Sequence, residues 1–352
     1  MVNRTRFAGI AYAVGAAALF GASTPLAKRL LPSVDPVLMA GLLYAGSGVG
    51  LAAYRVARGS RARKEPHLAR RDVPWLVAAI VCGGVLGPVL LMVGLLKTPA
   101  SSTSLLLNLE GVLTVLLAWF VFKEHFDRRV ATGMVLISGG AFALSWSGRP
   151  ELGMPWGALA IAGACLAWAA DNNLTRHVST ADPVQIAMLK GISAGVANTC
   201  LALSLGAALP PIGRLAAIAA VGFLGYGVSL VLFVLALRHL GTARTGAYFS
   251  LAPFLGTTVS ILWLQEPFTA GLLVAAVLMS AGVWLNLTER HEHEHTHEAV
   301  EHEHLHQHDE HHRHAHGPSD PAGELHSHRH RHEPLTHRHR HYPDVHHRHG
   351  HS

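Results

Sequence analysis

Glu110 lies near the middle of a long apolar run, where a carboxylate is costly and therefore informative. An ionisable side chain at the centre of a membrane span costs about 3 kcal/mol on insertion scales, so it usually faces a cavity or a partner. Helical spacing places Thr103 and Thr114 on its stripe, with Asn108 about 200° around the helix. This pattern predicts a contact surface for a solute or a coupling proton. The alternative is that Glu110 only bonds a neighbouring helix.

Polar residues recur at related places in the second half of the chain. A shift of 142 residues pairs Thr103 with Thr245 and Asn108 with Ser250. These pairs predict two helices that present polar groups at corresponding depths to a shared central cavity.

Four further polar residues lie in or at the end of apolar runs. Asp171 and Asn172 are a candidate gate or substrate contact, although a carboxylate near a span end can equally be solvated at the membrane interface. Tyr226 and Tyr248 can stack on a ligand or hydrogen-bond to it. Their alternative role is interfacial anchoring.

A second chemistry is concentrated after Arg290, where 23 of the 27 histidines occur, mostly in His-x-His alternation. Neutral imidazole is a ligand for zinc, nickel, cobalt and copper, and alternation on a flexible chain lets several rings reach one ion. The segment is almost without apolar residues, which predicts disorder. The predicted metal ligands are His291, His293, His295, His297, His302, His304, His306, His308, His311, His312, His314, His316, His326, His328, His330 and His332.

Ten apolar segments must position these groups. Each has about 18 to 25 residues, enough to cross about 30 Å of hydrocarbon as a helix. Charged residues make up only 14% of the chain and concentrate in loops and the tail. The fold class is therefore predicted to be an all-α membrane protein with ten transmembrane helices. The predicted spans are 7–27, 36–54, 73–96, 100–122, 130–147, 156–174, 184–206, 215–237, 242–264 and 268–287.

The basic residues predict the orientation of these spans. With the N-terminus in the cytoplasm, the loops on that side hold 15 Lys and Arg residues and those on the opposite side hold five, which favours this orientation. An even number of spans then places both termini in the cytoplasm, in a multi-pass protein of the cell inner membrane. The pI near 9.5 thus reflects helix orientation in a lipid bilayer, and no nucleic-acid partner is expected.

The two halves of the apolar region resemble each other. Asp35-Pro36 precedes Asp182-Pro183 by 147 residues, and the shift of 142 aligns residues 123–126 (KEHF) with residues 265–268 (QEPF). Five spans in each half is an odd number, so the second copy enters the membrane from the opposite side, as an inverted repeat. The expected domains are two five-helix repeats, 1–147 and 148–288, and a cytoplasmic tail, 289–352.

The loop motif Lys/Gln-Glu-x-Phe and the Gly-rich helix start at residues 132–140 (TGMVLISGG) resemble the EamA-type permeases of the drug/metabolite transporter superfamily. The resemblance covers nearly all of residues 7–288. It implies secondary transport, often export, of small metabolites such as amino acids or nucleobases. Glu124 and Glu266, within the loop motif, are expected to cap or pair locally rather than to contact substrate.

The leading prediction is a secondary transporter, in particular an exporter, of small organic solutes by alternating access, with a metal-binding tail that regulates or buffers. The alternative is a transition-metal (Ni, Co or Zn) exporter or a metal-sensing membrane protein. The spans contain no His pair and few carboxylates, which favours the organic solute. No enzyme motif occurs, so neither catalysis nor a required cofactor is expected. Expected partners are the lipid bilayer, a small-molecule substrate and divalent metal ions. The sequence leaves open whether the protein forms a homodimer.

Overall fold

The structure is a computed structural model. It describes residues 2–58, 70–122, 128–145, 156–175, 178, 182–240 and 242–288. In the tail it describes residues 292–297, 301–306, 326–331 and 335–340.

Helices account for nearly all of the described residues of the first half, and two of its predicted spans are interrupted. The span predicted at 73–96 contains a π-helix, and the one predicted at 100–122 is broken at Leu107 and Asn108. The elements are α1 (Val2–Leu30), η1 (Leu31–Ser33), α2 (Pro36–Arg58), η3 (Arg70–Asp72), α3 (Val73–Ala79), η4 (Ile80–Leu86), α4 (Gly87–Lys97), α5 (Ala100–Leu106), α6 (Leu109–Phe122) and α7 (Arg128–Ser145).

The second half repeats this sequence of elements, including its interruptions. A second π-helix lies within the span predicted at 215–237, and the span predicted at 242–264 is broken at Ser250 and Leu251. The elements are α8 (Trp156–Thr175), α9 (Pro183–Ser204), α10 (Ile212–Gly222), η7 (Phe223–Val228), α11 (Ser229–Leu240), α12 (Thr242–Phe249), α13 (Ala252–Trp263) and α14 (Ala270–Leu287). The shift of 142 residues carries the first break to residues 249 and 250, one residue before the second break.

The described helices confirm an all-α membrane protein. Within the part of the chain that the structure describes, seven segments are long and apolar enough to cross a membrane: Phe7–Ser33, Pro36–Ala57, Val73–Lys97, Ala100–Leu117, Val184–Ser204, Ile212–Ala236 and Ala270–Leu287. The other three predicted spans coincide with α7, α8 and the pair α12 and α13, which are helical but are not among those seven.

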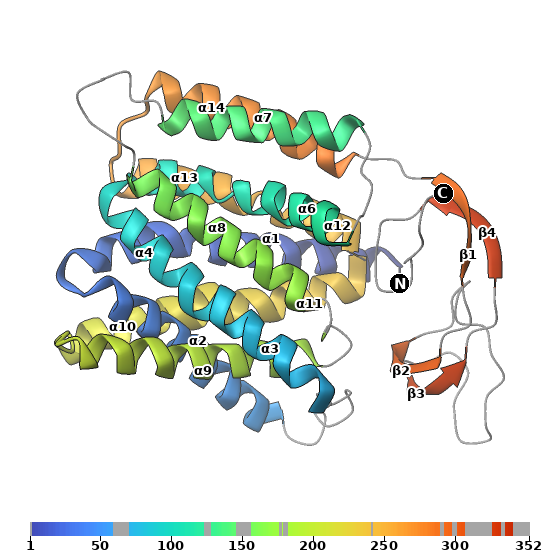
Figure 1. Ribbon diagram of the computed structural model, residues 1–352, viewed down its shortest axis with the longest axis horizontal. Coiled ribbons are helices and arrows are strands. Elements are labelled where there is room, and N and C mark those ends of the chain that lie inside the picture. The colour runs from blue at the N-terminus through green and yellow to red at the C-terminus, as the bar shows by residue number, and fades with distance from the viewer. Residues whose placement is uncertain are drawn as a thin grey trace.

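The helix contacts of the first half recur in the second half when each helix is replaced by its repeat counterpart. Helix α2 packs along α9, and α7 packs along α14; α1 contacts α11 and α13, while its counterpart α8 contacts α4 and α6. Figure 1 shows α7 and α14 side by side along one edge of the bundle. This recurrence is what an internal repeat predicts.

Close backbone approach holds the central pair α2 and α9 together. A Cβ on Gly191 would lie 2.7 Å from the Cα of Gly48, so neither position has room for a side chain. Small residues at helix crossings are typical of membrane bundles, because close packing supplies much of the attraction between helices in lipid.

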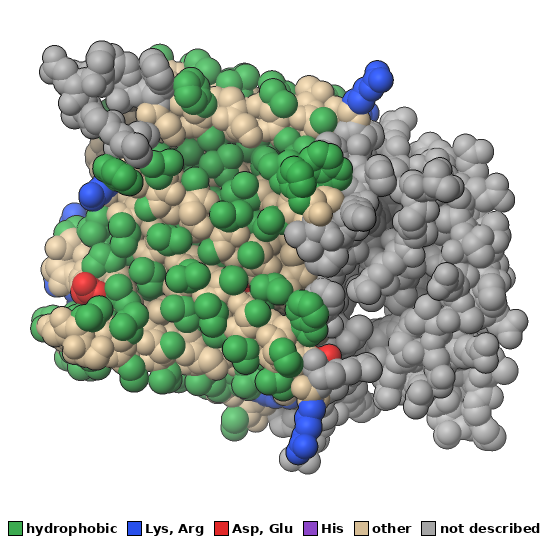
Figure 2. Space-filling view, in the orientation of Figure 1, with side chains coloured by type: hydrophobic (Ala, Val, Ile, Leu, Met, Phe, Trp, Pro, Cys, Tyr) green, Lys and Arg blue, Asp and Glu red, His purple; other side chains and the backbone are tan. Residues whose placement is uncertain are grey.

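The face of the helical bundle seen in Figure 2 is largely apolar. Figure 2 shows hydrophobic side chains spread over the face in view, with Lys, Arg and acidic side chains near its margins. Phe120, Val135 and Trp284 are more than half exposed. A lipid environment accounts for such exposure.

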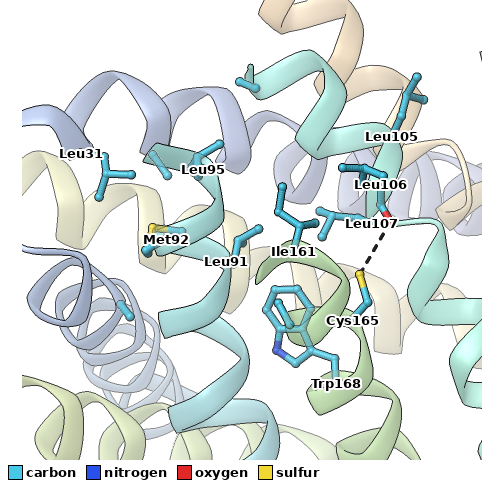
Figure 3. Packing of buried hydrophobic residues seen from close by; sticks show 14 of the residues in the cluster. Leu31, Leu91, Met92, Leu95, Leu105, Leu106, Leu107, Ile161, Cys165 and Trp168 are labelled. Atoms are coloured by element: carbon cyan, nitrogen blue, oxygen red, sulfur yellow. Dashed lines mark hydrogen bonds between the residues drawn. The ribbon is translucent and has the colours of Figure 1, made fainter. Parts of the chain in front are cut away.

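The interior is filled by aliphatic side chains from many helices. Figure 3 shows Leu91 of α4 pointing toward Ile161 of α8, while Met92 points to the other side of α4. Cys165 is buried, with its thiol 3.7 Å from the carbonyl oxygen of Leu106, whereas Cys200 is exposed. All three cysteines are free thiols.

The connection between α4 and α5 is closed by charged side chains from both halves. The Lys28 ammonium donates to the carbonyl oxygens of Leu95 and Thr98 at the end of α4. The Glu266 carboxylate accepts from the N–H groups of Ala100 and Ser101, at 2.7 and 2.8 Å, at the start of α5. These caps satisfy helix-end groups. The expected capping role of Glu266 is therefore confirmed, whereas Glu124 lies outside the described residues.

Four short strands lie in the tail: β1 (Glu292–His297), β2 (Glu301–His306), β3 (His326–Arg331) and β4 (Leu335–Arg340). They form two antiparallel pairs, β1 with β4 and β2 with β3. The histidine side chains predicted to bind metal lie outside the described part of the chain, so the predicted disorder and metal binding of the tail stay predictions.

Candidate functional site

The break in the fourth helical segment places Glu110 in the first turn of α6. Around the break, the N–H of Asn108 donates to Leu105 and the N–H of Glu110 donates to Leu107, at 3.0 and 3.1 Å. A carboxylate in the first turn of a helix is favoured by the helix dipole. The predicted single stripe assumed one continuous helix, and the break at Leu107 and Asn108 interrupts the helix between Thr103 and Glu110.

Glu110 is joined to α8 by Asn172. The Asn172 amide donates to a carboxylate oxygen of Glu110 at 2.8 Å and to the Thr114 hydroxyl at 3.4 Å. The Thr114 hydroxyl donates to the Glu110 carbonyl at 2.8 Å. Asn172 is exposed and Glu110 is half-buried, so this Glu110 cluster (Glu110, Thr114 and Asn172) is accessible from outside the packed core.

Asp171 belongs to a separate ion pair. Lys190 of α9 donates to both carboxylate oxygens of Asp171 at 2.6 Å, and the Thr175 hydroxyl donates to one of them at 2.9 Å. The side chains of Lys190 and Asp171 are only 17% and 9% exposed. Consecutive residues of a helix project about 100° apart, so Asp171 and Asn172 serve different neighbours of α8.

The π-helix η4 lies against this ion pair. Its Gly83 carbonyl accepts from the Tyr44 hydroxyl at 2.8 Å and from the Trp168 indole at 2.9 Å. The Gly84 carbonyl accepts from the Asn198 amide at 3.1 Å. Single-turn π-helices inside α-helices occur frequently at functional sites. Here the widened turn lets side chains from α2, α8 and α9 bond to one stretch of backbone.

Tyr226 lies in a row of aromatic rings that extends from Tyr44 into the second half. Its ring centroid lies 5.7 Å from that of Tyr44 and 5.8 Å from that of Phe20. The row continues from Phe20 to Phe249 at 5.5 Å and then to Phe233 at 4.9 Å. These separations are typical of attractive ring pairs. The row therefore links η7 and α12 to Tyr44, whose hydroxyl donates to the backbone of η4.

Two predicted site residues of the first half serve local structure. The Thr103 hydroxyl donates to the Pro99 carbonyl at 2.9 Å within its own helix. The Asn108 amide donates to the Leu105 carbonyl at 2.9 Å and lies 3.8 Å from the Met279 sulfur. Both side chains are buried, and neither joins the Glu110 cluster.

The predicted residues of α12 and its end are dispersed. Thr245 is fully buried, and its hydroxyl has no hydrogen-bond partner among the described residues. Tyr248 packs against Ala13 and Leu240 at the edge of the bundle. Ser250 lies in the break between α12 and α13.

A small crevice of about 10 Å³, roughly the room for one water molecule, lies between α1, α5 and α13, lined by residues that include Phe20, Ser104 and Pro253. Small-molecule sites usually enclose roughly 300–1,000 Å³. A solute could therefore enter this crevice only after the three helices separate.

Lys190, Tyr44 and Trp168 were absent from the predicted site. A lysine inside the apolar run 184–206 is itself a functional signal, because intramembrane charges usually face a partner. Tyr44 and Trp168 carry no comparable signal, since aromatic residues are common in membrane spans. Among the described residues, no group of three His, Cys, Asp and Glu side chains is arranged to hold a metal ion.

Comparison with known proteins extends these observations. A protein of Methanothermobacter thermautotrophicus described as an uncharacterized transporter is 27% identical over 287 residues, covering 77% of this chain and 84% of that protein. A solved crystal structure with 18% sequence identity superposes with a TM-score of 0.59 over 80% of this chain and 95% of that chain, which supports the fold alone.

The family model described as the EamA-like transporter family matches the chain twice, over residues 7–146 and 155–288. The two matches cover both helical halves and confirm the resemblance drawn from the loop motif. They also place the protein among membrane transporters rather than enzymes. The chain belongs to the EamA-like transporter family.

Proposed function

We propose that this protein exports small organic metabolites by alternating access and that its solute or coupling proton binds at the Glu110 cluster. The observation that carries the proposal is the carboxylate of Glu110 at a helix break, bonded to Asn172 of α8 at 2.8 Å and accessible from outside the core. In this proposal the tail binds divalent metal ions and either regulates transport or buffers the metal ions.

The chemistry of the Glu110 cluster suits a polar organic solute. A carboxylate accepts hydrogen bonds from amines and hydroxyls, and the Asn172 amide and Thr114 hydroxyl can donate or accept. Charge-assisted hydrogen bonds are roughly twice as strong as neutral ones. Glu110 is therefore the group whose removal should affect binding most.

The basic loops support an orientation with both termini in the cytoplasm. At that end, Arg55 of α2 pairs with Asp182 at 2.8 Å, and Asp182 also caps α9 through the Val184 N–H at 2.9 Å. Its repeat counterpart Asp35 caps α2 in the same way. The Arg55 pair thus joins the two halves at the proposed cytoplasmic side.

Glu110→Gln should weaken binding of the solute at least tenfold, because it removes the charge while keeping the shape of the side chain. The measurement is thermal stabilisation of the purified full-length protein by a panel of amino acids, nucleobases and nucleosides. Thr114→Val, next to Glu110, should also weaken the response. Thr258→Val is the matched control, since its hydroxyl makes the same kind of bond, to the Phe254 carbonyl at 2.9 Å. Equal stabilisation of wild type and Glu110→Gln by every responding solute would remove Glu110 from the site.

Truncation after Arg290 separates an organic cargo from a metal cargo. The shortened chain keeps all the helices and loses 23 histidines. Binding of the organic solute should stay within twofold of the full chain, and high-capacity binding of Zn²⁺ or Ni²⁺ should disappear. Loss of cellular metal resistance on truncation, with organic-solute phenotypes unchanged, would instead favour a metal exporter.

A further inference from the structure

Two charged side chains lie about one helical turn from the crevice between α1, α5 and α13. Thr24 of α1 lines the crevice, and Lys28 follows it by about one turn. Ser104 of α5 lines it too, and Ala100 precedes it by about one turn. Glu266 lies just beyond the end of α13. The charges thus lie at one end of the same three helices, which is the outer end in the orientation proposed above.

Glu266 fastens the second half of the chain to the start of α5. Its two carboxylate oxygens accept from the N–H groups of Ala100 and Ser101 at 2.7 and 2.8 Å. Hydrogen bonds to a charged group are roughly twice as strong as neutral ones. Lys28 donates to the Thr98 carbonyl at 2.9 Å, just before α5, and its charge attracts that of Glu266. We call Lys28 and Glu266 the outer latch.

The residue before Glu266 has an unfavourable backbone conformation. Gln265 has φ 56°, and among the residues that the structure describes no other non-glycine residue has a positive φ. This left-handed region is costly for a residue with a Cβ. The Gln265 amide donates to the Leu262 carbonyl at 2.6 Å, which fixes the turn against the end of α13. Strain of this kind persists where neighbouring contacts hold it, and it often occurs in segments that switch conformation.

The closed crevice contains a second unfavourable feature. The Ser104 side chain lies in a residue that is only 1% exposed, and its hydroxyl has no hydrogen-bond partner among the described residues. A buried polar group without a partner is destabilising. Separation of α5 from α13 would give this hydroxyl water or a solute to bond. The closed arrangement is therefore stabilised by the bonds of Glu266 and opposed by the strain at Gln265 and the unpaired hydroxyl of Ser104.

The helix breaks allow the ends of α5 and α13 to move. The break at Leu107 and Asn108 separates α5 from α6, and the break at Ser250 and Leu251 separates α13 from α12. Hinges are commonly a few residues at the ends of elements. Leu107 also lines the crevice and lies three residues before Glu110. Opening at the latch would thus extend from the outer end toward the Glu110 cluster.

We propose that α5 and α13 form the outer gate of the transporter and that the outer latch, with the strained Gln265 beside it, controls how often this gate opens. The inference rests on the alternating access proposed above. The solute passes the gate when Glu266 releases the start of α5, and the gate closes when these bonds form again.

The reactivity of a thiol in the crevice measures the opening. In the full-length protein, with Cys82, Cys165 and Cys200 replaced by alanine, the variant Ser104→Cys places a thiol at a position that is 1% exposed when the gate is closed. Glu266→Gln keeps the shape of the side chain and removes its charge. The rate of modification by a membrane-impermeant methanethiosulfonate should therefore rise at least fivefold.

Asp35→Asn is the matched control, because it removes a capping charge at the same end of the bundle. The Asp35 carboxylate accepts from the N–H groups of Val37 and Leu38 at 2.9 and 3.1 Å, within one half of the chain. Its loss should leave the modification rate within twofold of the parent. Lys28→Met removes the other member of the outer latch and should raise the rate, which gives a second test if Glu266→Gln does not fold.

Gln265→Gly tests the role of strain in the gate. Glycine adopts φ 56° without the cost imposed by a Cβ, so the closed gate should be favoured and the modification rate should fall at least threefold. An unchanged or higher rate would show that strain at this residue does not promote opening.

Two results would overturn the latch: an unchanged rate in folded Glu266→Gln, or an equal rise in Asp35→Asn. The measurement needs no solute, so its outcome does not depend on whether Glu110 binds one. Solute exchange that requires Glu110, found together with an unchanged modification rate in Glu266→Gln, would keep the proposed function and remove the latch.

Discussion

Lys190→Met should lower the free energy of unfolding by about 3–5 kcal/mol, because it leaves the buried carboxylate of Asp171 without its cation. Lys190 donates to both carboxylate oxygens at 2.6 Å, and the two side chains are 17% and 9% exposed. Thermal unfolding of the purified protein measures the effect. The matched control is Lys97→Met, because Lys97 is exposed at the end of α4 and its loss should cost less than about 0.5 kcal/mol.

A second variant distinguishes the ion pair from simple loss of packing. Asp171→Asn combined with Lys190→Met removes both charges and keeps the volume of the aspartate side chain. Replacing both members of a buried pair is usually far less destabilising than replacing one. The double variant should therefore recover more than half of the stability lost in Lys190→Met. A Lys190→Met protein as stable as wild type would show that the ion pair does not support the fold.

Gly83→Ala should lower the free energy of unfolding by about 2–3 kcal/mol through overpacking of the same site. A Cβ at Gly83 would overlap the Asp171 carboxylate and lie 2.6 Å from its Cβ. The carboxylate cannot move away freely, because Lys190 and Thr175 hold it. The Gly83 carbonyl also accepts two hydrogen bonds, which a shift of η4 would strain.

Gly111→Ala is the control for this substitution. A Cβ at Gly111, one residue after Glu110, would meet nothing within 4 Å, so alanine should be tolerated there. The thermal midpoints of the two alanine variants, measured in the same detergent, give the comparison. Equal midpoints would mean that η4 yields to the added methyl group at little cost.

Sequence patterning predicted most helix ends closely, because charges, prolines and polar turns mark where apolar segments leave the membrane. The segment predicted at 36–54 begins at Pro36, and the segment predicted at 156–174 corresponds to Trp156–Thr175. The breaks at residues 107–108 and 250–251 and the two π-helices were missed. Hydropathy stays high through such irregularities, since the lost backbone bonds are replaced by contacts with other helices.

The three residues of the Glu110 cluster were all predicted as site residues, but contact between them was predictable only within one helix. Thr114 follows Glu110 by one turn, and the two do interact. The partner Asn172 lies 62 residues further along and reaches Glu110 because α6 packs on α8. Single-helix spacing contains no information about that packing. The stripe through Thr103 assumed a continuous helix, and spacing alone does not reveal the break at Leu107 and Asn108.

The repeat connects the fold to the proposed transport. The counterpart segments share helix breaks, π-helices and the caps of Asp35 and Asp182. The two halves differ in their ionisable groups, since the shift of 142 residues pairs Glu110 with Ala252. A symmetric scaffold can exchange two similar conformations, while one carboxylate defines where the solute or proton binds.

Solute exchange in proteoliposomes tests the central claim most directly. Proteoliposomes would contain full-length wild type, Glu110→Gln or the chain truncated after Arg290. The vesicles would be loaded with the amino acids and nucleobases that stabilise the protein, and exchange of labelled solute would be followed from pH 5 to 8. Wild type and the truncated chain should exchange at least one organic solute at similar rates, and Glu110→Gln should do so at less than a tenth of that rate while remaining folded. Exchange by Glu110→Gln at the wild-type rate at every pH, or movement of Zn²⁺ with no organic solute, would contradict the account.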